Sequence, residues 1–232
     1  MVARSLFVWL LALPMAAQAA GTIAIDVGHY LDAPGVISAH GRPEFEFNRD
    51  LARDIEGELQ ARSRATHLIG AEGTMNSLPA RPRAAAGAAL FVAVHHDSMQ
   101  EHLLSTWMVD GVERKYGDRF EGFSLFVSRE NAGWKKGLAC ASAIGAALIK
   151  AGFKPSLYHA DPKVGENRAF ADKRNGVHYF DRLAVLRNAN MPALLFEAGV
   201  IVNRAEEKRM ADPAVRKRIA AAVSDGIERC MP

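Results

Sequence analysis

Hydrophobic positions follow two periods along the chain. Short continuous apolar runs predict buried strands, whereas apolar residues spaced three or four positions apart predict amphipathic helices. The predicted strands lie at 22–27, 66–70, 89–96, 123–128, 183–188 and 192–199, and the predicted helices at about 48–62, 79–87, 134–151 and from 213 onward. Their alternation predicts a single α/β domain with a mostly parallel twisted sheet and helices on both faces.

Polar residues mark where these elements begin and end. Asn48 is predicted to cap the first helix and Asp212 the last, where Pro213 occupies the first turn. Two long polar connections remain, 99–122 and 153–182. Loops of this length in a compact domain are usually functional or disordered. Both are expected to flank a site near the end of the strand at 89–96.

The first 19 residues resemble a secretory signal. Arg4 precedes an apolar stretch, and Ala17-Gln18-Ala19 has the small-x-small pattern of a signal peptidase site. An uncleaved anchor is the alternative, but Pro14 breaks the stretch, which is short for a membrane span. We therefore expect a signal peptide at 1–19, no stable membrane insertion after cleavage, and an exported, periplasmic protein.

The mature chain is expected to hold one domain at 20–232. Arg4 is the only charge in the removed segment, so the formal net charge falls from +3 to +2. That charge is too small, and Lys and Arg too scattered, to indicate a nucleic-acid partner. The two cysteines, Cys140 and Cys230, lie on apolar sides of predicted helices and could form a disulfide after export or remain two buried thiols.

Histidines at the ends of two predicted strands indicate a metal site. His29 follows the first strand and His95 ends the strand at 89–96. Ligand sites in open α/β sheets lie at the carboxyl ends of strands, and catalytic zinc often takes two histidines and one carboxylate. Glu44 is the favoured third ligand, with Glu46 as its competitor. Glu197 ends an apolar strand, where it could act as a base toward a water molecule.

Several neighbouring residues each allow more than one role. Groups near the predicted ligands could orient a ligand ring through its other nitrogen, and strand alternation sends His96 to the face opposite His95, where a purely structural role is equally open. The candidates for orienting a ring are Asp26, His96 and Asp97. Residues in the second connection or at a helix start could touch substrate or border its groove, or could simply be exposed; these are His159, His178, Arg81 and Arg83.

Four segments, in this order, resemble the zinc-dependent N-acetylmuramoyl-L-alanine amidase family of cell-wall hydrolases. They are DVGH (26–29), PEFEFN (43–48), VAVHHDS (92–98) and LRNANMPALLFEAGVIVNRAEE (186–207). The resemblance implies that His29, Glu44 and His95 bind zinc and that Glu197 is catalytic. It also implies that residues 20–232 form a zinc amidase catalytic domain acting on peptidoglycan, expected as a monomer, and an activator protein is one of the partners that the resemblance allows.

The chain departs from the usual family wording in three places. DVGH lacks the proline that usually precedes the glycine, HHDS replaces a small residue and an asparagine after the ligand, and 99–122 is longer than usual. This long segment is the expected cover of the site, through Leu103, Leu104, Trp107 and Met108. Two alternatives stay open: a non-catalytic peptidoglycan-binding module with structural zinc, and a zinc peptidase that cuts within the stem peptide.

Overall fold

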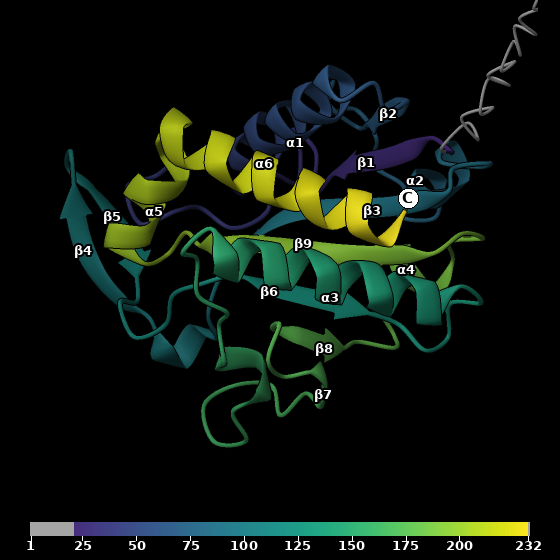
Figure 1. Ribbon diagram of the computed structural model, residues 1–232. Coiled ribbons are helices and arrows are strands. Elements are labelled where there is room, and N and C mark those ends of the chain that lie inside the picture. Colours follow the sequence, from purple (N-terminus) through teal and green to yellow (C-terminus); the bar gives the residue numbers. More distant parts are fainter. Residues whose placement is uncertain (1–20, 232) are drawn as a thin grey trace, which may run out of the picture.

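A seven-stranded sheet with the order β2-β1-β3-β9-β6-β8-β7 forms the centre of the molecule (Figure 1). This computed structural model describes residues 21–231, so the predicted signal peptide lies outside the described residues. Strands β2, β1, β3 and β9 are parallel, whereas β6 pairs antiparallel with β9. The sheet is therefore mostly parallel in its first half and mixed beyond β9.

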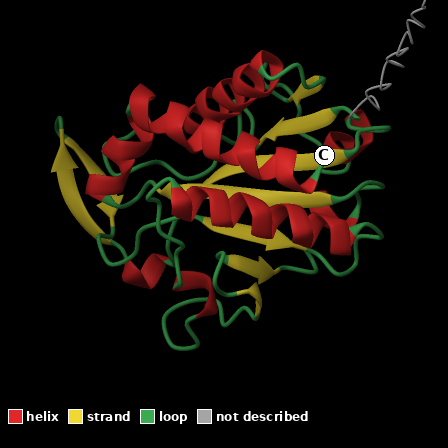
Figure 2. Ribbon diagram, viewed as in Figure 1, coloured by secondary structure: helices red, strands yellow, loops and turns green. Residues whose placement is uncertain are grey.

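Helices and strands are interspersed along the chain (Figure 2). They are β1 (Ile23–Val27), α1 (Glu44–Ala61), β2 (Thr66–Ile69), α2 (Ala80–Ala84), β3 (Leu90–Asp97), β4 (Ser105–Val109), β5 (Val112–Tyr116), β6 (Ser124–Val127), α3 (Trp134–Lys150), β7 (Phe170–Asp172), β8 (Val177–Tyr179), α4 (Ala184–Arg187), β9 (Ala193–Val200), α5 (Arg204–Ala211) and α6 (Pro213–Cys230). Among these helices, none combines the length and hydrophobicity needed to cross a bilayer.

The two faces of the sheet carry helices of unequal length. The long helices α1, α3 and α6 cover one face, where Ile23, Ile25 and Val27 of β1 enter the larger core. The short helices α2 and α4 belong to the other face, where Ala24 of the same strand enters a smaller core. Alternation along each strand separates the two cores. The predicted fold class, a single α/β domain with helices on both faces, is confirmed.

Two predictions about local structure are wrong. The segment 183–188 is not a strand: it contains α4, whose Val185 and Leu186 are buried in the smaller core. Its Ala, Leu and Arg residues favour helix, and a short apolar run alone does not separate the two states. Asn48 does not cap α1, because the helix begins four residues earlier, at Glu44, and Asn48 lies inside it.

The long connections contain structure that the hydrophobic pattern did not predict. Strands β4 and β5 form a hairpin within 99–122, and Asp110 and Gly111 at its turn have positive φ angles of 49° and 77°. An Asp-Gly pair between two strands is a strong hairpin signal, so this element could have been predicted from the sequence.

Helix α5, which lies outside these connections, was not predicted either. Asn203 caps it by accepting hydrogen bonds from the backbone N–H groups of Ala205 and Glu206.

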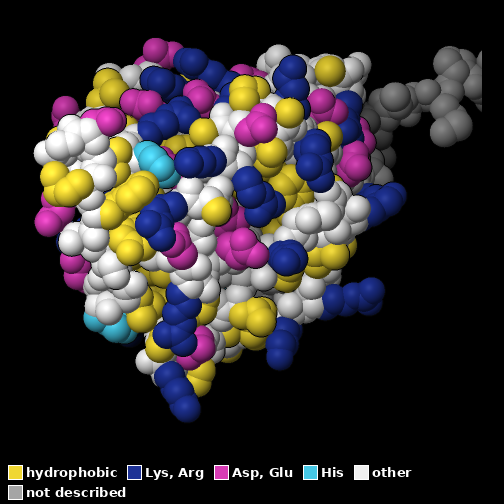
Figure 3. Space-filling view, turned by 90° about the vertical axis from the view of Figure 1, so that its left-hand side faces the viewer, with side chains coloured by type: hydrophobic (Ala, Val, Ile, Leu, Met, Phe, Trp, Pro, Cys, Tyr) yellow, Lys and Arg dark blue, Asp and Glu magenta, His cyan; other side chains and the backbone are white. Residues whose placement is uncertain are grey.

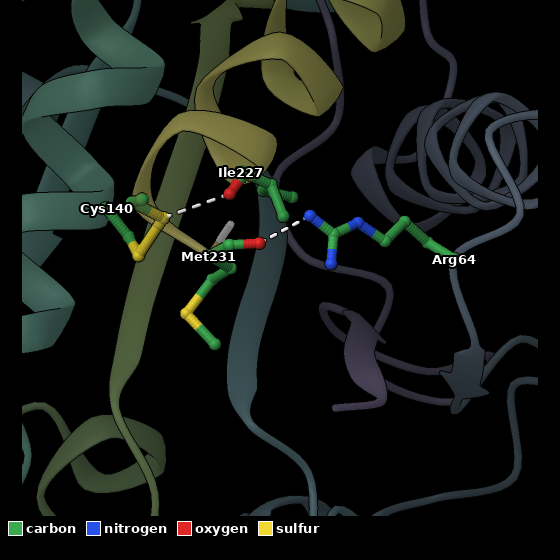
Figure 4. The surroundings of a disulfide bond; sticks show 5 residues. Arg64, Cys140, Ile227 and Met231 are labelled. Carbon is green, nitrogen blue, oxygen red and sulfur yellow. Dashed lines mark hydrogen bonds between the residues drawn. A yellow bond between two sulfur atoms is a disulfide. The ribbon is translucent and has the colours of Figure 1, made fainter. Parts of the chain in front are cut away.

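A disulfide joins Cys140 of α3 to Cys230 of α6, which resolves the alternatives left open for the two cysteines (Figure 4). Nearby, the guanidinium of Arg64 donates to the carbonyl of Met231 and holds the end of α6 against the loop before β2. The disulfide closes a loop across 90 residues and links two helices of the same layer. Such a link stabilises the fold mainly by restricting the unfolded chain.

Candidate metal centre

Three side chains from separate parts of the chain meet at the carboxyl end of the sheet. His29 follows β1, Glu44 is the first residue of α1 and His95 lies near the end of β3. One donor atom from each lies within 4.8 Å of the others. Nε2 of His29 is 3.0 Å from Oε2 of Glu44, and Nδ1 of His95 is 3.0 Å from Oε1 of the same carboxylate. The structure thus brings together the three residues that the sequence singled out.

Two glycines make room for this cluster. A Cβ atom on Gly28 would lie 2.2 Å from Nε2 of His95, so no larger residue fits between the ends of β1 and β3. Gly35 has a φ of 80°, and a Cβ atom there would lie 2.3 Å from Oε2 of Glu44. His29 itself has a φ of 68°, an uncommon conformation for a residue other than glycine. The backbone around the cluster is therefore shaped closely to the three side chains.

Glu44 carries the negative charge of the cluster. Its side chain is buried, and the backbone N–H of Val36 donates to Oε2 at 3.2 Å. Burial alone would raise the pKa of Glu44, but the hydrogen bonds with His29 and His95 outweigh it and lower the pKa. The competing candidate, Glu46, instead pairs with Arg42 at 3.1 Å with its side chain 43% exposed. Only Glu44 reaches the two histidines.

The donor set fits a zinc ion. Two atoms bound tetrahedrally to zinc at about 2.1 Å lie roughly 3.4 Å apart. Each histidine lies 3.0 Å from a different oxygen of Glu44, and one donor atom from each residue lies within 4.8 Å of the others. Two imidazole nitrogens and one carboxylate oxygen are donors that zinc accepts, and three protein ligands leave one position for water or substrate. The buried carboxylate of Glu44 lies between the rings of His29 and His95, and a bound cation would balance its negative charge.

Glu197 lies beside this cluster on β9. It pairs in register with His95 of β3, and Ala193 and Leu195 of its own strand enter the smaller core, so its side chain belongs to the same face. Its Oε2 atom is buried and has no hydrogen-bond partner among residues 21–231. Burial, together with the carboxylates of Asp97 and Glu44, raises the pKa of Glu197 well above its ordinary value. Glu197 as a whole is partly exposed, and its buried oxygen calls for a partner that residues 21–231 do not supply.

Asp26 and Arg81 form a buried ion pair below the cluster. Nη1 of Arg81 donates to Oδ1 of Asp26 at 2.8 Å, and the guanidinium also donates to the carbonyls of Val27, His29 and Met75. Burial raises the pKa of Asp26 to about 6, and Arg81 limits the rise. The sequence suggested that Asp26 could orient a histidine ring, but in the structure its carboxylate pairs with Arg81 instead. Arg81 instead holds the loop that carries His29.

His159 joins the second long connection to the end of β3. Its Nε2 donates to Asp97 at 2.6 Å and its Nδ1 to Glu166 at 2.9 Å, and both ring nitrogens are thereby protonated. Burial opposes the charge, but the two carboxylates raise the pKa of His159 to about 9. Asp97 is thus committed to His159 and not to a ligand ring.

The sequence suggested that His159 and His178 could touch substrate, but the structure buries both side chains. His178 stacks between Phe126 and Phe170, with ring centroids 5.5 and 4.5 Å away. Burial lowers the pKa of His178 to about 4, so the ring is neutral. His178 is therefore part of the packing of β8.

A cavity of about 100 Å³ opens next to His29 and His95. Its other walls come mainly from the loops after β1 and β2, through residues that include Tyr30, Met75 and Leu78. Among the described residues, none from 99–122 lines this cavity, and the expected cover of the site by this segment stays a prediction. The β4–β5 hairpin instead borders a separate cavity of about 350 Å³, which shares Val36 with the surroundings of Glu44.

The face at the carboxyl ends of the strands carries charges of both signs. Figure 3 views the molecule from this side and shows Lys and Arg side chains interspersed with Asp and Glu. No broad basic surface is visible on this face, in agreement with the small net charge of the sequence.

This fold, with a His-Glu-His cluster beside a glutamate that has one buried and unpartnered oxygen, is typical of a metal-dependent hydrolase. Residues 23–229 match the N-acetylmuramoyl-L-alanine amidase family, and the chain belongs to that family. It is 24% identical over 225 residues to the N-acetylmuramoyl-L-alanine amidase AmiC of Neisseria meningitidis serogroup B, covering 89% of this chain and 52% of AmiC. The chain thus spans about half the length of that curated relative.

Solved structures of amidases share the fold. Ami1 from Mycobacterium smegmatis has a TM-score of 0.72 at 20% sequence identity, with 92% of this chain and 97% of Ami1 covered. The CwlD amidase from Clostridioides difficile, solved in complex with the GerS lipoprotein, has a TM-score of 0.68 at 17% identity, with 90% of this chain and 98% of CwlD covered. At these identities the likeness concerns the fold.

Proposed function

We propose that the protein is a zinc-dependent N-acetylmuramoyl-L-alanine amidase, which hydrolyses the amide between the lactyl group of N-acetylmuramic acid and L-alanine in peptidoglycan. The observation that carries the proposal is the convergence of His29, Glu44 and His95 within 4.8 Å in a chain of this family. In this proposal the three side chains hold the zinc ion, and residues 20–232 are the catalytic domain.

Glu197 is the proposed catalytic base. A bound zinc ion would lower the pKa of water and polarise the carbonyl of the scissile amide. The carboxylate of Glu197 accepts a proton from the attacking water and returns it to the leaving nitrogen of L-alanine. Burial raises the pKa of Glu197, and this makes its carboxylate a stronger base toward the attacking water.

The proposal extends to where the protein acts and with what. We place it outside the cytoplasm, in the periplasm, after removal of residues 1–19, because its substrate is the cell wall and its two cysteines form a disulfide. CwlD was solved in complex with a lipoprotein, which supports a possible protein activator here. We expect the catalytic domain to be a monomer.

The reaction products separate the amidase from its alternatives. Purified mature protein loaded with zinc is incubated with peptidoglycan, and the soluble products are analysed by mass spectrometry. We expect complete stem peptides that begin with L-alanine and are free of sugar, and no release after treatment with a chelator. Fragments cut within the stem peptide would indicate a peptidase, and binding without products would indicate a non-catalytic module.

A further inference from the structure

We propose that His96 and Asn48 form a positioning pair for Glu44, in which His96 fixes the orientation of the Asn48 amide and that amide fixes the carboxylate. The inference rests on the proposed function only in assigning Glu44 to the metal. Neither His96 nor Asn48 offers an atom to the cluster of candidate ligands. Both would act on the metal through Glu44.

The hydrogen-bond partners of the Asn48 side chain favour one orientation of its amide. Asn48 is completely buried in α1, one turn after Glu44. Its Nδ2 donates to Oε1 of Glu44 at 3.0 Å and to the carbonyl oxygen of Gly28 at 3.2 Å. Both partners are acceptors only, so the NH₂ group must face them and Oδ1 must face the opposite way. One amide group thereby ties the carboxylate to the loop that carries His29.

His96 satisfies the other side of the same amide. Its side chain is 2% exposed, and Nδ1 lies 2.8 Å from Oδ1 of Asn48. Because a carbonyl oxygen only accepts, Nδ1 of His96 must carry the proton. A reversed amide would set its oxygen against two other acceptors and its NH₂ against the N–H of the ring. The histidine therefore selects the orientation in which Asn48 donates to Glu44.

Strand geometry explains why His96 can do this while His95 cannot. The two side chains point to opposite faces of the sheet, so His95 reaches the cluster and His96 reaches α1. There the ring of His96 packs against Phe47, with centroids 5.5 Å apart. The backbone N–H of His96 also lies 3.3 Å from Oε1 of Glu44. The two adjacent histidines thus serve the same carboxylate from two sides.

The pair should matter for metal affinity more than for folding. Without a donor at position 96, Oδ1 of Asn48 is buried without a partner and the amide loses its preferred orientation. Groups that orient a metal ligand typically change metal affinity about 10- to 100-fold when removed. An effect of this kind passes entirely through Asn48, which makes it testable by combining substitutions.

The test measures the zinc affinity of the mature protein by competition with a chelator of known affinity. We expect His96→Phe, which keeps a ring against Phe47 but has no donor, to bind zinc about 10-fold more weakly. His96→Gln keeps an N–H donor and should bind close to the wild-type value. Asn48→Ala should weaken binding by about 10- to 100-fold, and adding His96→Phe to it should change nothing further.

His178→Phe is the matched control, because His178 is also a buried strand histidine and lies on β8, away from Glu44. It should leave zinc affinity unchanged. Should His96→Phe not fold, His96→Met is compared with His96→Gln, since the two side chains have similar size and only the amide donates.

Four results would contradict the inference. Wild-type zinc affinity in His96→Phe would show that the ring is not needed, and a loss that persists unchanged in the Asn48→Ala background would show that it does not act through Asn48. Wild-type protein without a zinc site would remove both this inference and the proposed function. Tight zinc binding that none of the variants alters would remove this inference alone.

Discussion

Glu197 on β9 and His95 on β3 occupy the same register position on neighbouring parallel strands. Side chains at such paired positions project from the same face, so the proposed base lies beside a proposed ligand without any loop having to place it. This face carries the short helices α2 and α4, and a cavity opens beside His95 at the end of β3. The rigid sheet thus fixes the distance between the proposed base, Glu197, and the proposed ligand, His95.

Replacing Glu197 with Gln should abolish most amidase activity without removing the metal. The amide keeps the size of the side chain but cannot accept and return a proton, and loss of such a base typically lowers the rate about 10²- to 10⁴-fold. Activity is measured by release of stem peptides, and metal content by elemental analysis. Glu46→Gln, which alters a carboxylate paired only with Arg42 in a salt bridge, should keep full activity. Turnover near the wild-type rate in Glu197→Gln would exclude this residue as the base.

Gly28→Ala should disrupt the metal site. The new Cβ atom would lie 2.2 Å from Nε2 of His95, so the ring or the loop carrying His29 must move. We expect zinc affinity to fall at least about 10-fold, a typical result of disturbing ligand orientation. Gly57→Ala is the control, because its Cβ has no atom within 4 Å and Ala in a helix adds about 0.5–1 kcal/mol of stability. Unchanged zinc affinity in Gly28→Ala would contradict the observed packing of the site.

Arg81→Met should destabilise the whole protein. The substitution leaves the buried carboxylate of Asp26 without its cation and three backbone carbonyls without a donor. Breaking a buried pair from one side typically costs about 3–5 kcal/mol. Arg83→Met, in the same short helix but exposed, should change the free energy of unfolding by less than about 0.5 kcal/mol. Equal stability of the two variants in urea unfolding would disagree with this role of Arg81.

Stability should fall as the pH rises from about 6.5 to 9 because of His159. Its carboxylate partners raise its pKa in the folded state to about 9, above the 6.5 of an ordinary histidine. The stabilisation is complete below the lower value and is lost as the pH rises through the higher one. The shift corresponds to at most about 3 kcal/mol. Urea unfolding at several pH values should show this slope in wild type and a flatter one in His159→Gln; parallel curves would contradict the prediction.

Much of the site could be predicted from sequence because its chemistry lies at strand ends. A strongly apolar run fixes the strand around His95, and parallel strands bring their carboxyl ends to one edge, so His29 and His95 could be expected to meet. Glu197 could be predicted as a site residue because an acidic side chain ends a strongly apolar strand. Local pattern and global topology agree at these positions.

Other features depend on contacts that the pattern does not encode. Arg81 resembles an exposed helix residue, and only the tertiary structure shows it buried against Asp26. The prediction that Asn48 caps α1 failed because the helix begins at Glu44, and the amide of Asn48 instead bonds Glu44 and, on β3, His96. His159 is bound to Asp97, 62 residues away in the chain. Such long-range polar pairs follow from the fold and could not be placed before it was known.

The location of a bound metal tests the central claim most directly. Crystals of the zinc-loaded protein would be measured above and below the zinc absorption edge to locate the ion from its anomalous signal. We expect one zinc ion at about 2.0–2.2 Å from a nitrogen of His29, a nitrogen of His95 and an oxygen of Glu44, with no bond to Glu197. A zinc ion elsewhere, or one enclosed by Glu197 as a fourth protein ligand, would contradict the account.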